Sequence, residues 1–238
     1  MIVALSALAA FSIYTSGIST ITHFAIIIGI ATALDIFINY FLYKEKPMPK
    51  SAIITGFIIA LILAPSSALW AQVGIPLFAI ASKHIIKWKK VNVFNPAALA
   101  LLIGGFVGAL PSWWAVSPLV WPLGIFISWK MRKLEISLSF LAAYFILFTA
   151  LGRIDPGMEV MGSAAMFLAF FMATEPKTTP SSGNGKIIFG ILLAILSLGI
   201  AMVVPAVDFL LGALLISNIF KNHLNAVKFA FFGNKLFL

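Results

Sequence analysis

The sequence predicts an all-α, polytopic membrane protein, and its composition and hydropathy carry that prediction. Hydrophobic residues make up 62% of the 238 residues and charged residues 10%, against about 45–50% and about 25% in soluble globular proteins. Apolar runs recur along the whole chain and raise the mean hydropathy to +1.09. A soluble domain of this length cannot bury so much apolar surface, so the chain is expected in a lipid bilayer.

The absence of cysteine and the distribution of the basic residues argue against several other classes of protein. The chain has no cysteine, which excludes a disulfide scaffold, cysteine-ligated zinc, an iron–sulfur cluster held by this chain alone and thiol catalysis. The formal net charge is +9, but the basic residues lack the continuous stripe that would favour nucleic-acid binding. His23, His84 and His223 stand far apart, so no metal site is predicted. His84, which lies among lysines, is expected at the membrane interface.

Polar clusters divide the chain into candidate membrane-spanning segments of unequal length. A spanning helix needs about 20 apolar residues, and several segments are shorter, such as 52–64 before Pro65 and 95–110, which opens with Asn95-Pro96. Such segments are typical of broken helices in two-repeat membrane folds. The first segment lacks the basic start and cleavage site of a signal peptide, so it is kept as a helix. The ten segments are 1–16, 19–43, 52–64, 69–86, 95–110, 113–129, 135–151, 159–174, 187–204 and 208–220.

The placement of basic residues predicts how these segments are oriented. With the N-terminus inside the cell, 15 of the 16 Lys and Arg residues fall in inner loops, and Arg153 is the exception. Cytoplasmic loops of membrane proteins carry this excess of positive charge. Tryptophans lie near segment ends, as interfacial aromatics do: Trp70, Trp88, Trp113, Trp114 and Trp129. We therefore expect a multi-pass protein of the cell (plasma) membrane with both termini in the cytoplasm.

Ten helices divide into two groups of five. A repeat with an odd number of helices inserts its second copy upside down, which produces inverted-topology symmetry. The third segment of each group ends with a proline, Pro65 in one and Pro176 in the other. We therefore expect about ten transmembrane helices arranged as two inverted five-helix repeats with broken helices. The repeats would be residues 1–110 and 111–238 of one integral membrane domain.

Asp35 is an acid deep inside a predicted membrane segment. It lies more than two helical turns before Lys44, the first lysine of the inner loops. A carboxylate at that depth costs about 2.5–3.5 kcal/mol or more unless it meets protein or water. A structural hydrogen bond between helices would explain it, and so would a cation or proton site.

Two further acids stand at segment ends. Glu175, which lies between Thr174 and Pro176, is either a helix-end carboxylate in the inner loop or part of an ion pathway. Asp208 opens the tenth segment. Capping alone would explain a carboxylate at a helix N-terminus, and an ion pathway is again the alternative.

The run KVNVFNPAALALL, residues 90–102, contains two asparagines that flank a hydrophobic pair. Because Pro96 favours the first turn of a helix, Asn95 is expected to cap that helix. The cap leaves Asn92 unexplained. Two carboxamides can also offer paired donors and acceptors to a flat heterocycle such as a flavin ring. The chain lacks a phosphate-binding glycine loop and a serine-hydrolase elbow, so no catalytic residue is predicted and the chain is not expected to be an enzyme alone.

Several runs resemble one family of membrane subunits. Residues 92–97, NVFNPA, meet the family pattern N-x-F/L-N-P-A, and residues 169–176, AFFMATEP, meet A-F-F-x-A-T-D-P with Glu for Asp. The following T-T-P…G-R/K…F-G is met by residues 178–190, and Asp208 and Asn218 keep the spacing of a late P-D-G…N segment. The matches run in order from about residue 20 to 220. The chain is thus similar to the membrane subunit shared by the Rnf complex, where it is called RnfD, and the sodium-pumping NADH:quinone oxidoreductase (Nqr), where it is called NqrB.

The resemblance implies an Rnf/Nqr-like electron-transport complex with other membrane and peripheral subunits as partners. In that family this subunit binds flavins, riboflavin or FMN, and electron flow is coupled to sodium or proton movement. The membrane acids of the family fall on Asp35, Glu175 and Asp208, which are expected to form part of an ion pathway. The family's asparagines fall on Asn92 and Asn95, which are expected to contact a non-covalent flavin.

One departure from the family pattern concerns covalently bound FMN. Family members carry, after the fifth helix, a loop with an S-x-A-T-type motif whose threonine takes FMN through a phosphoester. Here the loop is only Leu110-Pro111-Ser112-Trp113, so no covalent FMN is predicted. A small-solute channel or transporter of urea-transporter-like architecture and a redox-inactive structural subunit remain alternative functions, because fold does not dictate function.

Overall fold

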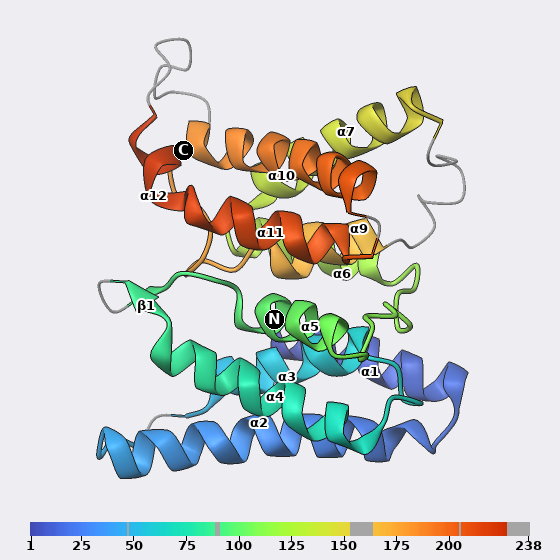
Figure 1. Ribbon diagram of the computed structural model, residues 1–238, viewed down its shortest axis with the longest axis vertical. Helices are drawn as coiled ribbons and strands as arrows, with labels where there is room; N and C mark the ends of the chain where they lie inside the picture. Colours follow the sequence, from blue (N-terminus) through green and yellow to red (C-terminus); the bar gives the residue numbers. More distant parts are fainter. Residues whose placement is uncertain (47, 89–90, 153–163, 205, 228–238) are drawn as a thin grey trace.

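The computed structural model describes residues 1–46, 48–88, 91–152, 164–204 and 206–227, and it is helical almost throughout (Figure 1). The first helices are α1 (Ile2–Ser16), α2 (Thr20–Leu42), α3 (Lys50–Ile62), α4 (Leu69–Ile85) and α5 (Pro96–Phe106). A short antiparallel hairpin, β1 (Lys87–Trp88) and β2 (Val91–Asn92), joins α4 to α5. The later helices are α6 (Val120–Lys130), α7 (Leu134–Ala150), α9 (Ala164–Phe167), the π-helix η1 (Leu168–Met172), α10 (Gly183–Val203), α11 (Phe209–Ile219) and α12 (Lys221–Ala226). The predicted all-α class is confirmed.

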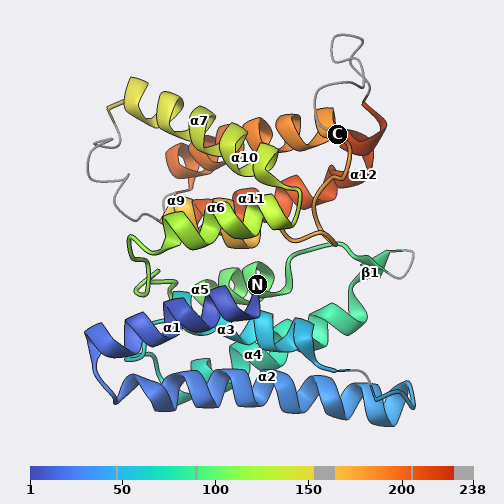
Figure 2. The ribbon, with the colours of Figure 1, turned by 180° about the vertical axis from the view of Figure 1, so that it is seen from behind.

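The helices gather in two groups that follow the order of the chain. Figures 1 and 2 show α1 to α5 together in one half of the molecule and α6 to α12 in the other. Helix α5 packs against α11 and helix α1 against α6, so the two groups meet through these pairs. This boundary brings the hairpin and the start of α5 close to the C-terminal helices.

The helices differ in length, as the unequal apolar segments of the sequence predict. Of the described helices, α2 with 23 residues and α10 with 21 are long and apolar enough to cross a membrane. Helices α1, α3, α5, α7 and α11 are apolar but have only 10–17 residues. At 1.5 Å of rise per residue, the 13 residues of α3 extend about 20 Å, less than the roughly 30 Å of a bilayer core.

The sixth segment is shorter than the sequence predicts. A helix was expected from residue 113, but α6 begins at Val120. The preceding residues instead cover the C-terminal end of α3. Backbone N–H groups of Ser112 and Trp113 donate to the carbonyl oxygen of Ile62 at 3.0 Å, and Ala115 donates to Leu61 at 3.3 Å. These carbonyls have no partner within α3, so the segment before α6 supplies the hydrogen bonds that the end of α3 lacks.

Several tight contacts between helices depend on glycine, and Gly56 and Gly190 are two examples. A Cβ at Gly56 of α3 would lie 3.0 Å from the Cα of Ile28 on α2. A Cβ at Gly190 of α10 would lie 2.7 Å from the carbonyl oxygen of Ile136 on α7. Small residues at such points allow the backbones of membrane helices to approach closely. The sequence around these glycines therefore sets the distance between neighbouring helices.

The π-helix η1 packs against α6, α7 and α9 and is fully buried. A π-turn breaks the regular α-helical hydrogen bonds and needs other partners for its carbonyls. The hydroxyl of Ser137 on α7 donates to the carbonyl oxygen of Ala169 at 2.7 Å, and the hydroxyl of Thr174 donates to Phe170 at 2.7 Å. These contacts fix the direction in which the chain leaves η1 toward Glu175.

Candidate functional site

Asp35 lies on α2 and faces α4, where two nitrogen-containing side chains meet it. Its Oδ1 atom lies 2.8 Å from Nζ of Lys83 and 3.0 Å from Nε2 of His84. The three side chains are only 4%, 10% and 9% exposed, respectively. The ring of Tyr43 stacks on His84 with 5.7 Å between centroids. Asp35 thus faces the protein interior, and its contacts fit the expected structural bond between helices.

Lys83 and His84 were not predicted to belong to this cluster. The sequence assigned Lys83 to an inner loop and His84 to the membrane interface, but both belong to the last turns of α4 and both are largely buried. The imidazole of His84 turns inward to the carboxylate, a contact that the sequence did not predict. Asp35 and Lys83 are 48 residues apart, so only the packing of α2 on α4 brings them together.

Asn92 ends the hairpin and lines a cavity of about 520 Å³. The side chain is buried, and its Nδ2 atom is a buried hydrogen-bond donor without a partner among the described residues. The cavity is also lined by Trp88 of the hairpin and by Asn218 and Lys221 of the C-terminal helices. An unpaired amide at the wall of a cavity of this size is suited to a ligand that carries a hydrogen-bond acceptor.

Asn95 lies just beyond this cavity, and its position is explained by the fold. Its side-chain oxygen accepts from the N–H of Ala98 at 3.0 Å, so the prediction that it caps the following helix is confirmed. Its backbone N–H donates to Oδ1 of Asn218 at 3.0 Å, and Nδ2 of Asn218 donates to the carbonyl oxygen of Thr178 at 3.1 Å. Asn218 therefore ties the start of α5 to the loop after η1.

A second cavity, of about 310 Å³, lies between the two groups of helices. Asn95 and Glu175 both line it, together with Lys50, Lys177 and mainly apolar side chains. Burial raises the pKa of the Glu175 carboxyl to about 7, against the smaller opposing effect of Lys177. A carboxyl with this pKa changes its charge near neutral pH. The two asparagines of the motif thus line different cavities, and Asn95 shares one with a predicted ion-pathway residue.

Asp208 is engaged in structural contacts. Its Oδ1 accepts from the N–H of Leu211 at 2.9 Å, so the predicted cap of α11 is confirmed. Its Oδ2 accepts from the indole N–H of Trp113 at 2.8 Å. The adjoining cavity measures only about 10 Å³. Asp208 lines neither the cavity of Asn92 nor the cavity of Glu175, and its contacts hold the shortened loop before α6 against α11.

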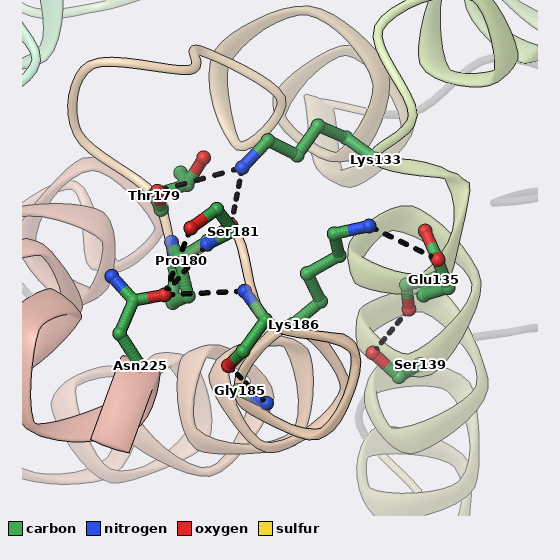
Figure 3. A network of polar contacts seen from close by, with 10 residues as sticks. Lys133, Glu135, Ser139, Thr179, Pro180, Ser181, Gly185, Lys186 and Asn225 are labelled. Atoms are coloured by element: carbon green, nitrogen blue, oxygen red, sulfur yellow. Dashed lines mark hydrogen bonds and ion pairs between the residues drawn. The ribbon is translucent and has the colours of Figure 1, made fainter. Parts of the chain in front are cut away.

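A polar network holds the loop that carries Glu175 (Figure 3). The ammonium group of Lys133 donates to the carbonyl oxygens of Thr179 and Pro180, and burial lowers its pKa to about 8. Nζ of Lys186 lies 3.1 Å from Oε1 of Glu135. Figure 3 shows the Lys133 side chain reaching the loop at Thr179 and Pro180 and the Lys186 side chain reaching Glu135. The contacts of Lys133 tie this loop to the start of α7, and the Lys186–Glu135 pair ties α10 to α7.

The predicted site residues do not converge on one point. Asn92 lines the larger cavity, Asn95 and Glu175 line the second cavity, Asp35 forms a buried ion pair, and Asp208 caps α11. The sequence missed Asn218 as a site residue. Its spacing of ten from Asp208 was the signal that could have found it, since Asn218 lines the cavity of Asn92 and binds the backbone of Asn95.

Comparison with known proteins gives a consistent set of relatives. Residues 98–232 match the NQR2, RnfD, RnfE family. The chain is 28% identical over 222 residues to the D subunit of an ion-translocating oxidoreductase complex from Methanosarcina acetivorans, with 82% of this chain and 76% of that protein covered.

Bacterial proteins of the same name match shorter stretches. That of Haemophilus influenzae is 30% identical over 103 residues, 41% of this chain, and that of Actinobacillus succinogenes is 31% identical over 122 residues, 51% of this chain. The matches span only 29% of each of these bacterial proteins. The family match covers Glu175 and Asp208 and more than half of the sequence, so the chain belongs to the NQR2, RnfD, RnfE family of membrane-embedded proteins.

Proposed function

We propose that this protein is a membrane subunit of an Rnf/Nqr-like ion-translocating electron-transport complex and that it holds a non-covalent flavin. The observation that carries the flavin assignment is the buried, unpaired Nδ2 of Asn92 in a cavity of about 520 Å³. The relatives named as the D subunit of an ion-translocating oxidoreductase complex support the wider assignment. Partners would be the other membrane and peripheral subunits of such a complex.

The lining of the cavity fits a flavin. The isoalloxazine ring system is flat, with an apolar dimethylbenzene end and a polar pyrimidine end that carries carbonyl acceptors, and the Asn92 amide can donate to such an acceptor. Trp88 offers an aromatic face on which the ring could stack. Lys221 and His223 place basic groups at the wall, and these would attract the phosphate of FMN. When bound, a flavin supplies electron-transfer chemistry, and the role of this chain is to hold and orient the ring.

The ion pathway is the second part of the proposal. Asp35 supplies a carboxylate buried among membrane helices, and buried acids in membrane segments mark ion or proton pathways. Glu175 supplies a carboxyl at a cavity between the two groups of helices. Asp208 would supply a third carboxylate, at the N-terminal end of α11. Its present partners there are Leu211 and Trp113. The transported ion would be sodium or a proton.

The architecture that we infer for this function is a ten-helix fold of two inverted repeats, residues 1–110 and 111–238, with both termini in the cytoplasm. The separation of α1 to α5 from α6 to α12 supports it (Figures 1 and 2). The short helices α3, α5 and α11 also support it, since broken helices are typical of such folds. The shortened loop at Leu110–Trp113 supports the absence of a covalent FMN.

Replacement of Asn92 tests the flavin assignment. We expect the purified protein to show flavin absorbance and Asn92→Ala to weaken flavin binding about tenfold or more, because a lost hydrogen bond at a buried site costs about 1–3 kcal/mol. Asn184→Ala, on α10 and outside the cavity lining, is the matched control and should keep its flavin. Denaturation should release all flavin and leave the chain at its unmodified mass.

Three outcomes would contradict this assignment. Full flavin content in Asn92→Ala would remove the site, and an FMN mass on the denatured chain would show covalent attachment. A colourless protein that carries small neutral solutes into liposomes would instead favour the channel or transporter alternative.

A further inference from the structure

The loop after α2 folds back on the end of that helix and borders a further cavity, of about 350 Å³. Lys44 has a positive φ of 55°, the left-handed conformation that commonly ends a helix. The N–H of Glu45 then donates to the carbonyl oxygen of Asn39 at 3.0 Å. This turn brings the loop beside the last turns of α2. The cavity is lined by Ile36, Asn39, Tyr40, Glu45, Lys46 and Pro49.

The lining of this cavity changes from apolar to charged along the axis of α2. Helix α2 is long and apolar enough to cross a membrane, so its end lies where hydrocarbon gives way to lipid headgroups. Ile36 lies four residues, or about 6 Å of helix, before Tyr40, and the two side chains are 49% and 50% exposed. The neighbouring Phe37 and Phe41 are also exposed. The apolar part of the lining thus lies toward the bilayer and the charged part in the loop, which suits an amphipathic molecule.

The charged part of the lining offers both signs of charge without pairing them. Among the described residues, neither the Glu45 carboxylate nor the Lys46 ammonium group belongs to an ion pair. Nζ of Lys46 lies 5.6 Å from the centroid of the Tyr40 ring, a cation–π contact that leaves its N–H groups free to donate. Asn39 donates its Nδ2 to the carbonyl oxygen of Asp35 at 2.7 Å, which leaves its side-chain oxygen as an acceptor. One cavity therefore combines donors for an anion with acceptors for an ammonium group.

We propose that this cavity binds the headgroup of a zwitterionic membrane lipid that carries a primary ammonium group and a phosphodiester, as phosphatidylethanolamine does. The Glu45 carboxylate and the Asn39 side-chain oxygen accept hydrogen bonds from the ammonium group. The Lys46 ammonium group donates to the phosphodiester. Both contacts join charged partners, which makes them stronger than hydrogen bonds between neutral groups. The hydrocarbon chains of the lipid lie along the apolar surface at Ile36 and Phe37.

The arrangement of charges distinguishes this lipid from other common ones. Phosphatidylglycerol has no ammonium group for Glu45, and the methylated ammonium group of phosphatidylcholine has no N–H to donate. Free phosphoethanolamine has the same headgroup charges but lacks the chains that would cover the apolar part of the lining. The inference goes beyond the proposed function and does not depend on the flavin, on the ion pathway or on which face of the membrane the loop occupies.

Native mass spectrometry of the full chain in detergent tests the proposal, with the three lipids added at matched chain length. We expect phosphatidylethanolamine to bind about fivefold more tightly than phosphatidylglycerol or phosphatidylcholine, a factor that one exposed ion pair can supply. Glu45→Gln should remove this preference by weakening phosphatidylethanolamine alone, whereas Glu45→Asp should keep most of it. Lys46→Gln should weaken phosphatidylethanolamine and phosphatidylglycerol by similar factors.

Lys44→Gln is the matched control, since Lys44 is an exposed lysine of the same loop that does not line the cavity, and it should leave all three affinities unchanged. Glu45 and Lys46 are exposed as well, so their variants should keep the native melting temperature in detergent without added lipid. A change in lipid affinity then reports on the cavity rather than on folding.

The comparison of lipids on the native protein decides the proposal even if a variant fails to fold. Equal affinities for the three lipids would overturn it, and so would a preference for phosphatidylethanolamine that survives Glu45→Gln. Displacement of the lipid by an equal concentration of free phosphoethanolamine would overturn the assignment of a lipid as the occupant.

Discussion

At the scale of single residues, the polar side chains divide into those that the fold satisfies and those that it leaves available. Asn95 and Asp208 each cap a helix, so their positions need no ligand. Asn92 keeps a buried donor without a partner among the described residues, and Glu175 lies at a cavity with a pKa raised to about 7. Asn92 and Glu175 therefore give more direct support for a functional role than the residues that the fold already engages.

Glu175 gives a prediction of pH dependence. Its pKa rises from 4.5 to about 7 on folding, mainly through burial, so the folded state binds the proton more tightly than the unfolded state. Stability should therefore fall as the pH rises from about 4.5 to about 7 and change little from this group above that. Glu175→Gln should remove this slope and stabilise the protein at mildly alkaline pH, as measured by the melting temperature across pH.

The exposed Glu45 provides the control for that experiment. Glu45→Gln changes the same type of group outside the cavity and should leave the slope as in the native protein. An unchanged slope in Glu175→Gln would show that its carboxyl is already ionised across this range.

At the scale of helices, close packing and broken ends decide where the site residues lie. Helix α3 ends at Ile62 in the interior, and residues 112–115, in the segment before α6, donate hydrogen bonds to its last carbonyls. The π-turn η1 is held by Ser137 and Thr174 and directs the chain toward Glu175. These irregular elements place polar groups inside a molecule that is otherwise apolar.

The contact of α7 with α10 supplies a prediction at this scale. Gly190→Ala would place a methyl group against the Ser139 hydroxyl and 2.7 Å from the Ile136 carbonyl oxygen, and such overpacking costs about 1–3 kcal/mol. Gly199→Ala lies on the same helix with nothing within 4 Å of the new Cβ. We expect Gly190→Ala to lower the melting temperature and Gly199→Ala to leave it equal or higher. Equal melting temperatures for the two variants would mean that α7 and α10 separate easily.

At the scale of the whole molecule, the two groups of helices meet at the cavities. The wall around Asn92 combines the hairpin after α4 with residues of α11 and α12, and the wall around Glu175 combines α3 and α5 with the loop after η1. Both candidate sites therefore depend on how the two groups of helices pack. Asn218 lines the Asn92 cavity and connects it to the Glu175 cavity through hydrogen bonds with Asn95 and Thr178.

The proposed orientation in the membrane can be measured directly, because the chain has no cysteine and any introduced thiol is unique. Lys46→Cys lies in a predicted inner loop and Ser66→Cys in a predicted outer loop, and both positions are exposed. In intact cells with an accessible outer face, an impermeant maleimide should label Ser66→Cys, whereas Lys46→Cys should react only after permeabilisation. The reverse pattern would invert the proposed topology.

The sequence by itself determined the membrane class, most helix boundaries and both helix caps. These features depend on local composition, spacing and backbone chemistry: apolar runs form helices in lipid, and Asn95 before Pro96 or Asp208 after an irregular stretch caps the helix that follows. The family resemblance likewise came from local motifs, and the match over residues 98–232 bears it out.

Only the tertiary structure decided which polar groups meet. Lys83 and His84 reach Asp35 from another helix, Asn218 reaches Asn95 across 123 residues, and the two motif asparagines line different cavities. The late start of α6 was also decided there, because the preceding residues cover the end of α3. A buried polar group needs a hydrogen-bond partner nearby in space. Because that partner can lie far away along the chain, no local sequence pattern identifies it.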